Sequence, residues 1–240
     1  MKIAFLSDIH SAAAQFRKAL EAAREEGFDQ LVILGDLLTY GPRPAETLEI
    51  AHEAVDRDKA ILITGNHDML YLGGADSEAY VSALPDWIRE SVEWTSGQLI
   101  NGPSMADLPW QREWRVGDLY VSHANPFGFG DWTYLRDDPS FEAALAALAS
   151  KGARWGVFGH VHRFRQLAAK DGDGAVVTVG SLGQPRDKLD RSSQWAMATL
   201  GPAFGIERRP LIESWGCVLR EIQTTSMSDA TKERLCQFYL

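Results

Sequence analysis

The feature that most constrains the fold is a set of short polar motifs, each of which directly follows an apolar run typical of a β-strand. Asp, Asn and His dominate the motifs, which are Asp8-Ile9-His10, Gly35-Asp36, Gly65-Asn66-His67-Asp68, Ser122-His123 and Gly159-His160-Val161-His162. The carboxyl ends of the strands of an α/β protein converge in space, however far apart they lie in sequence. We therefore expect an α/β fold in which these five motifs meet at one polar site.

Strand and helix signals alternate in the first half of the chain. Strand-like runs at Lys2–Ser7, Leu31–Leu34 and Ala60–Thr64 are separated by segments with helical spacing of apolar residues, such as Ala45–Asp56. The later part is richer in strands, and we expect a hairpin of Gln111–Val116 with Leu119–Ser122, then antiparallel strands at Phe164–Lys170, Ala175–Val179, Gln194–Leu200 and Gly205–Arg209. This order predicts two sheets packed face to face with helices outside.

The domain organisation follows from what the sequence lacks. Residues 1–240 contain no internal repeat, low-complexity stretch or clear linker, so we expect one domain. The role of residues 211–240 stays open, although a short helix is expected from about Ser228.

The charge of the chain bounds its partners. The net charge of -9 disfavours binding to a nucleic-acid polymer. It leaves small anionic substrates open, because metal ions can make one pocket locally positive. No apolar run approaches membrane-spanning length, and the run after Met1-Lys2 is too short for a secretory signal. We expect a cytoplasmic protein without a membrane partner, whose oligomeric state the sequence leaves open.

The motifs together offer more carboxylate, amide and imidazole ligands than one metal ion can use. They predict a two-metal hydrolytic site, and the mixed nitrogen and oxygen donors suit Mn, Fe, Zn, Co or Ni better than Ca or Mg. Taken singly, Asp8 could be a helix cap, Asp36 a turn former and Asn66 a left-handed turn residue. Five of the six histidines follow strand signals, however, and only His52 lies within a predicted helix. This joint placement favours a metal site.

The order of the motifs resembles the pattern of the calcineurin-like metallophosphoesterase superfamily, which is D-x-H, G-D, G-N-H-D/E, a lone His and G-H-x-H. The resemblance is to the small bacterial phosphodiesterase and phosphatase branch, because residues 35–42 read G-D-L-L-T-Y-G-P and residues 180–186 read G-S-L-G-Q-P-R. It implies a four-layer α/β/β/α sandwich of two mixed β-sheets flanked by helices.

The resemblance also implies roles for the residues of the motifs. The first metal would be held by Asp8, His10 and His162, the second by Asn66, His123 and His160, and Asp36 would bridge them. His67 would lie near the leaving group as a catalytic residue, with Asp68 beside it in sequence. In the Ser/Thr protein phosphatases, G-D is followed by V-D-R-G, which supplies an Asp that orients the catalytic His and an Arg that binds phosphate. Residues 37–41 supply neither, so the orienting partner of His67 stays open.

The predicted activity is hydrolysis of a small phosphodiester or nucleotide, including dinucleoside polyphosphates. A metal-bridging hydroxide would attack phosphorus, and protonated His67 would act as general acid. The alternatives are a phosphomonoesterase or protein phosphatase, and a non-catalytic interaction scaffold on the same fold.

Residues beside the motifs are candidates for substrate binding. Arg43, Arg163 and Arg186 could hold phosphate or be ordinary surface residues. Trp132 and Tyr134 could stack a nucleotide base or belong to the core.

Overall fold

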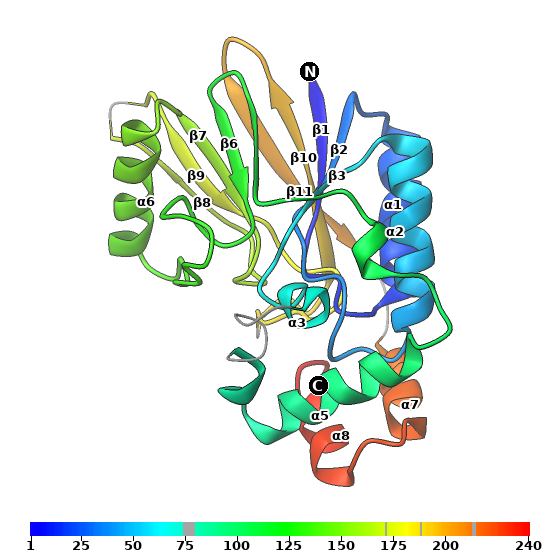
Figure 1. Ribbon diagram of the computed structural model, residues 1–240. Coiled ribbons are helices and arrows are strands. Elements are labelled where there is room, and N and C mark those ends of the chain that lie inside the picture. Colours follow the sequence, from blue (N-terminus) through cyan, green and yellow to red (C-terminus); the bar gives the residue numbers. More distant parts are fainter. Residues whose placement is uncertain (74–79, 171, 188, 213–214) are drawn as a thin grey trace.

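The computed structural model of the chain describes residues 1–73, 80–170, 172–187, 189–212 and 215–240. Figure 1 shows four layers, in which helix α6 covers one sheet, helices α1 and α2 cover the other, and the two sheets face each other between them. The predicted α/β/β/α sandwich of two mixed sheets is confirmed.

The first sheet has the strand order β11-β10-β1-β2-β3-β4. Its strands are β1 (Lys2–Leu6), β2 (Gln30–Ile33), β3 (Ile61–Ile63), β4 (Trp110–Gln111), β10 (Ser193–Leu200) and β11 (Phe204–Leu211). Strands β1 to β4 are parallel, whereas β10 pairs antiparallel with both β1 and β11. The parallel strands are connected through α1 (Ala13–Glu26) and α2 (Pro44–Asp58), as the alternating strand and helix signals predict.

The second sheet has the order β5-β6-β7-β9-β8. Its strands are β5 (Glu113–Val116), β6 (Leu119–Ser122), β7 (Trp155–Phe158), β8 (Arg165–Ala168) and β9 (Ala175–Thr178). Helix α6 (Asp138–Ser150) covers its outer face and begins with a capping box between Asp137 and Ser140. The predicted hairpin of β5 with β6 is present, but Gln111 is not part of it. Trp110 and Gln111 instead pair with β3, because the chain passes from one sheet to the other at this point.

Strand β1 is buried on both faces, which explains its continuous apolar sequence. Ile3 and Phe5 pack toward the second sheet, in the same cluster as Val121 and Val157. The alternate residues of the strand, Ala4 and Leu6, belong to the cluster beneath α1 and α2. Because the side chains of a strand alternate between its two faces, β1 contributes to both cores.

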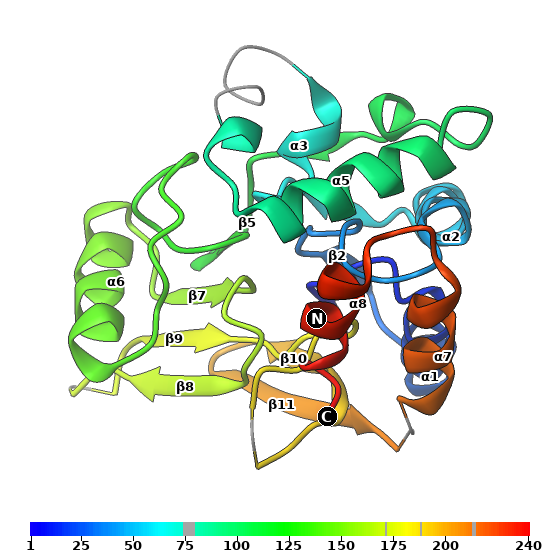
Figure 2. The same cartoon turned by 90° about the horizontal axis from the view of Figure 1, so that it is seen from below.

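A group of helices lies across the carboxyl ends of the strands, as Figure 2 shows from that side. It includes α3 (Met69–Leu72), α5 (Asp86–Gln98), α7 (Gly216–Thr224) and α8 (Asp229–Cys236), while the short η1 (Met105–Asp107) lies closer to α2. The sequence indicates α8 but not α7. Side chains of α7 and α8 pack with Trp87 and Ile88 of α5 around the buried Tyr40. The Tyr239 hydroxyl donates to the Gly183 carbonyl at 2.9 Å, so the tail residues contact the strand-end loops.

None of the helices in the described ranges is long and apolar enough to cross a membrane.

Candidate metal centre

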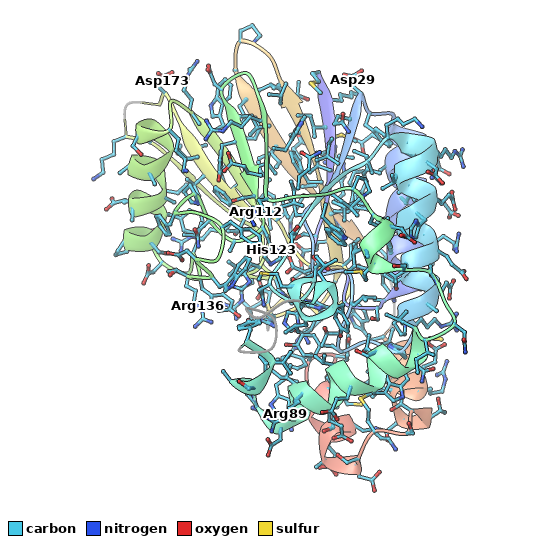
Figure 3. The ribbon with its side chains drawn as sticks, in the orientation of Figure 1. Asp29, Arg89, Arg112, His123, Arg136 and Asp173 are labelled. Atoms are coloured by element: carbon cyan, nitrogen blue, oxygen red, sulfur yellow. The ribbon has the colours of Figure 1, made fainter. Side chains whose placement is uncertain are left out.

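The five motifs meet where strands of both sheets end. Asp8 and His10 follow β1, Asp36 follows β2, and Asn66 follows β3, all from the first sheet. The second sheet contributes His123 after β6, and His160 and His162 after β7. Figure 3 shows His123 in the middle of the molecule, just above α3. All seven expected ligands are at most 4% exposed, so the centre is almost completely shielded from solvent.

The ligand atoms form two adjoining groups that share one carboxylate. Asp8, His10, Asp36 and His162 make the first group, and the second consists of Asp36, His123 and His160, with ligand atoms within 4.8 Å of one another in each. In the first, His162 Nε2 lies 3.2 Å from Asp8 Oδ1 and 3.2 Å from His10 Nε2. In the second, His123 Nε2 lies 3.4 Å from Asp36 Oδ2 and 3.2 Å from Asn66 Oδ1. Asn66 therefore joins the second group.

Each imidazole of the two groups is oriented by a backbone carbonyl. Because a carbonyl can only accept, the contacting ring nitrogen must carry a proton, and in the neutral ring the opposite nitrogen keeps a free lone pair. These bonds are His10 Nδ1 to Leu38 at 3.0 Å, His123 Nδ1 to Leu34 at 2.6 Å, His162 Nδ1 to Gln184 at 2.6 Å and His160 Nε2 to Trp132 at 3.0 Å. This orientation leaves Nε2 of His10, His123 and His162, and Nδ1 of His160, as the atoms that can bind a metal, which suits divalent ions.

The electrostatics of the groups also suit cation binding. Burial, reinforced by His123, lowers the pKa of His160 to about 3, so this imidazole is neutral at pH 7. Burial would likewise lower the pKa of His123, but the Asp36 carboxylate raises it to about 9. Burial opposes ionisation of Asp36, yet His123 and His67 hold the pKa of this carboxyl well below its usual range. The centre thus contains ionised carboxylates that need positive charge nearby.

The backbone around the ligands adopts an uncommon conformation. Five of the expected ligands have left-handed φ values, namely Asp8 (51°), His10 (45°), Asp36 (53°), His160 (65°) and His162 (60°). Ser11, Thr39 and Tyr40 beside them share this conformation, and Lys59 at the end of α2 is the remaining non-glycine example in the described chain. Such a conformation costs about 1–2 kcal/mol per residue, so its clustering marks a functional site.

Glycine at position 65 allows the close approach of two motifs. A Cβ atom there would overlap the carboxylate of Asp36. The glycine of the G-N-H motif is therefore required by the packing of Asp36 rather than by the conformation of its own backbone.

His67 lies beside the metal ligands but donates no atom to either group. Its Nδ1 lies 3.2 Å from the Thr39 hydroxyl, and its Nε2 lies 3.1 Å from the Tyr40 hydroxyl. Thr39 is in turn 2.8 Å from the hydroxyl of Tyr71. Thr39 and Tyr40 thus occupy both ring nitrogens of His67, which identifies the partners that the sequence left open. Burial lowers the pKa of His67 to about 4, which favours the neutral imidazole at pH 7.

The side chain of Asp68 is bonded to backbone amides. Its carboxylate accepts hydrogen bonds from the amides of Asp36 at 2.7 Å, Leu37 at 2.9 Å and Gly65 at 2.8 Å. These bonds tie together two of the strand-end loops. The geometry thus gives Asp68 a supporting role for Asp36.

The three candidate arginines lie in different surroundings. Arg186 is half-buried near the centre, where its charge contributes to lowering the pKa of His67 and His162 after burial itself. Arg163 is exposed and donates two hydrogen bonds to the carbonyl of Arg186. Arg43 forms ion pairs with Glu221 and Glu46 on the surface, so its guanidinium is already neutralised there.

Tyr134 and Trp132 pack against ligands of the second group. The Tyr134 ring stacks on His160 with centroids 4.1 Å apart, and Trp132 meets His123 edge-on at 6.1 Å. Both aromatics therefore form a wall of the centre. Sequence reasoning missed Thr39, Tyr40 and Gln184 as site residues, although they lie in the conspicuous segments 35–42 and 180–186.

Comparison with known proteins agrees with this geometry. The family model of the calcineurin-like phosphoesterase superfamily domain matches residues 1–200. The chain therefore belongs to the calcineurin-like phosphoesterase superfamily, and it is a metallophosphoesterase, a hydrolase of phosphoric esters.

Two curated relatives and one solved structure illustrate the similarity. Phosphodiesterase YfcE of Escherichia coli is 38% identical over 76 residues, covering 28% of this chain and 40% of that protein. The symmetrical bis(5'-nucleosyl)-tetraphosphatase of Shewanella baltica is 30% identical over 157 residues, covering 61% of this chain and 51% of that protein. The matched part of the chain thus spans about half or less of the length of these two relatives. A metallophosphoesterase from Sphaerobacter thermophilus has the same fold, with a TM-score of 0.74, 21% identity and coverage of 98% and 99% of the two chains.

Proposed function

We propose that the chain is a dinuclear metal-dependent phosphodiesterase that acts on a small phosphodiester or nucleotide, including dinucleoside polyphosphates. The observation that carries the proposal is the pair of adjoining ligand groups that share Asp36. A shared carboxylate is the arrangement that holds two metal ions close together in hydrolytic centres. Mn, Fe, Zn, Ni and Co all suit the donor set.

The protein residues would divide the remaining work. Divalent ions bound there would supply Lewis-acid activation of water and neutralise charge on the phosphate. Arg186 would hold a phosphate oxygen, because the partners of its guanidinium among the described residues, Gln184 and Tyr134, are neutral. His67 would donate its Nε2–H to the departing oxygen in exchange for its contact with the Tyr40 hydroxyl, while Nδ1 would accept from Thr39. Thr39 and Tyr40 would fix the direction of that ring.

Two observations favour a small diester over a phosphoprotein. The ligands are buried, which suits a compact substrate better than a folded protein surface. The relatives named above are a phosphodiesterase and a dinucleoside tetraphosphatase. A phosphomonoesterase remains the second candidate, because the same ligands would also bind a monoester. A non-catalytic scaffold is disfavoured, since every expected ligand is present.

A reconstitution assay tests the proposal. The protein is stripped with a chelator, reloaded with Mn, Ni, Zn, Co or Mg, and assayed with bis-p-nitrophenyl phosphate and p-nitrophenyl phosphate. We expect the diester to be hydrolysed with the higher kcat/KM. A preference for the monoester would support the second candidate, and no hydrolysis of either ester by any reloaded form would exclude both.

Variants separate metal binding from catalysis. His67→Ala should keep the metal content of the wild type, measured by elemental analysis, and lose roughly 10²–10⁴ in turnover. Asp36→Ala should lose metal as well as turnover. His52→Ala is the matched control, because His52 lies on α2 and its ring donates to the Ser104 carbonyl. Normal turnover of His67→Ala would remove His67 from the mechanism.

A further inference from the structure

An arginine-rich cavity of about 450 Å³ opens beside the metal centre. Val161 in its wall lies between the ligands His160 and His162, and Tyr134 in its wall stacks on His160. Arg186 also lines the cavity, and its charge contributes to lowering the pKa of His67 and of His162. The cavity and the metal centre thus share a boundary formed by Tyr134 and Arg186, whose hydroxyl and guanidinium lie 3.5 Å apart.

The lining of the cavity is positively charged. It contains Arg136, Arg163, Arg165 and Arg186 against a single carboxylate, Asp187. This concentration is unexpected in a chain with a net charge of -9. Clustered charge of one sign in a concave site raises the local concentration of the opposite ion. The cavity is therefore suited to an anion.

Three of these arginines have neutral partners in the described part of the chain. Arg136 lies over the ring of Tyr134 at 4.1 Å, Arg163 donates to a backbone carbonyl, and Arg186 donates to the side-chain oxygen of Gln184 and lies near the Tyr134 hydroxyl. Within the described ranges, none of the three has a carboxylate at ion-pair distance. Arg165 differs, because it is paired with Asp138. The unneutralised guanidinium groups leave N–H donors for phosphate oxygens, which arginine binds in a bidentate manner.

We propose that this cavity binds a second phosphate group of the substrate, remote from the phosphate that is cleaved. The proposal rests on the proposed phosphodiesterase function and narrows its substrate class to esters that carry at least two phosphates, such as a linear polyphosphate diester. Arg186 belongs to both sites, so a chain of phosphates would run from the metal centre past Tyr134 to Arg136 and Arg163. Figure 3 shows Arg136 on the outer side of the centre marked by His123, where such a chain would emerge.

A binding experiment tests the cavity without hydrolysis. Metal-free protein is titrated with inorganic tripolyphosphate by calorimetry, so that the metal centre offers no cation to the ligand. We expect tripolyphosphate to bind the wild type, and Arg136→Gln with Arg163→Gln to weaken binding about 100-fold, or about ten-fold per arginine. The matched control is Arg57→Gln, which should not affect binding, because the Arg57 side chain lies on α2 and is 65% exposed. No binding to the wild type, or equal binding to the double variant, would overturn the proposal.

A kinetic comparison separates this inference from the function on which it rests. The ratio of kcat/KM for bis(5'-adenosyl) tetraphosphate to that for bis-p-nitrophenyl phosphate is measured for the metal-loaded wild type and the double variant. We expect the ratio to fall at least ten-fold, because only the tetraphosphate carries distal phosphates. An unchanged ratio would refute a substrate role for the cavity. If the metal-loaded wild type hydrolyses neither ester but tripolyphosphate binds as expected, the phosphodiesterase function is refuted. The cavity would then still be an anion-binding site.

Discussion

Metal removal should lower the thermal stability of the protein by an amount that the structure allows us to work out. The ligands come from the ends of strands in both sheets, so bound ions would join the two sheets. The unfolded chain does not hold these residues together, and ions therefore bind the folded state preferentially. One site at a free metal concentration 100 to 1,000 times its Kd stabilises by about 2.7–4.1 kcal/mol. At roughly 2–4 °C per kcal/mol for a chain of this size, one site corresponds to about 5–16 °C in Tm.

The assay is a circular-dichroism melt of the metal-loaded protein, the chelated protein and the chelated protein after metal is restored. Restoring the metal should restore Tm. Asp36→Asn should show a much smaller chelator-dependent shift, because it removes the carboxylate shared by both groups. His52→Gln should show the full shift, because His52 lies outside the centre. A wild-type shift below about 2 °C would refute the reasoning that metal joins the sheets.

Three further substitutions test single contacts. Thr39→Val removes the hydroxyl beside His67 Nδ1 and should lower kcat about ten-fold with unchanged KM and metal content. Thr39→Ser should restore kcat. An unchanged kcat in Thr39→Val would show that Thr39 does not position His67. Gly65→Ala should lower metal content measured by elemental analysis, because its Cβ overlaps Asp36; full occupancy would contradict the packing argument. Tyr239→Phe removes the bond to the Gly183 carbonyl and should lower stability by about 1 kcal/mol in a denaturant titration.

The position of the centre could be predicted from sequence because its signal is local. An apolar run followed by a carboxylate or imidazole marks the end of a buried strand, and such ends converge in α/β folds. The division of Gln111 and Glu113 between two sheets could not be predicted in this way. The alternation of side chains is the same in either sheet, so only tertiary pairing decides which edge each residue joins.

The directions of individual side chains also could not be predicted from the sequence. Arg43 and Arg186 both lie beside motifs in sequence, yet Arg43 turns to Glu221 on α7 and Arg186 lies at the centre. Which of the two faces the centre depends on an acidic partner far along the chain. The contact of Thr39 with His67 could not be predicted for a similar reason, since it depends on the direction of the Thr39 side chain.

The left-handed backbone of the ligands bears on how readily such a centre can be lost. Glycine and asparagine tolerate this conformation better than histidine does, so replacing His160 or His162 by either would relieve local strain while removing an expected metal ligand. Selection for stability alone would therefore act against the centre, and only selection for its chemistry would keep it. A homologue that is no longer selected for activity could lose these histidines one at a time and retain the α/β/β/α fold. The same architecture is thus well suited to giving rise to inactive relatives.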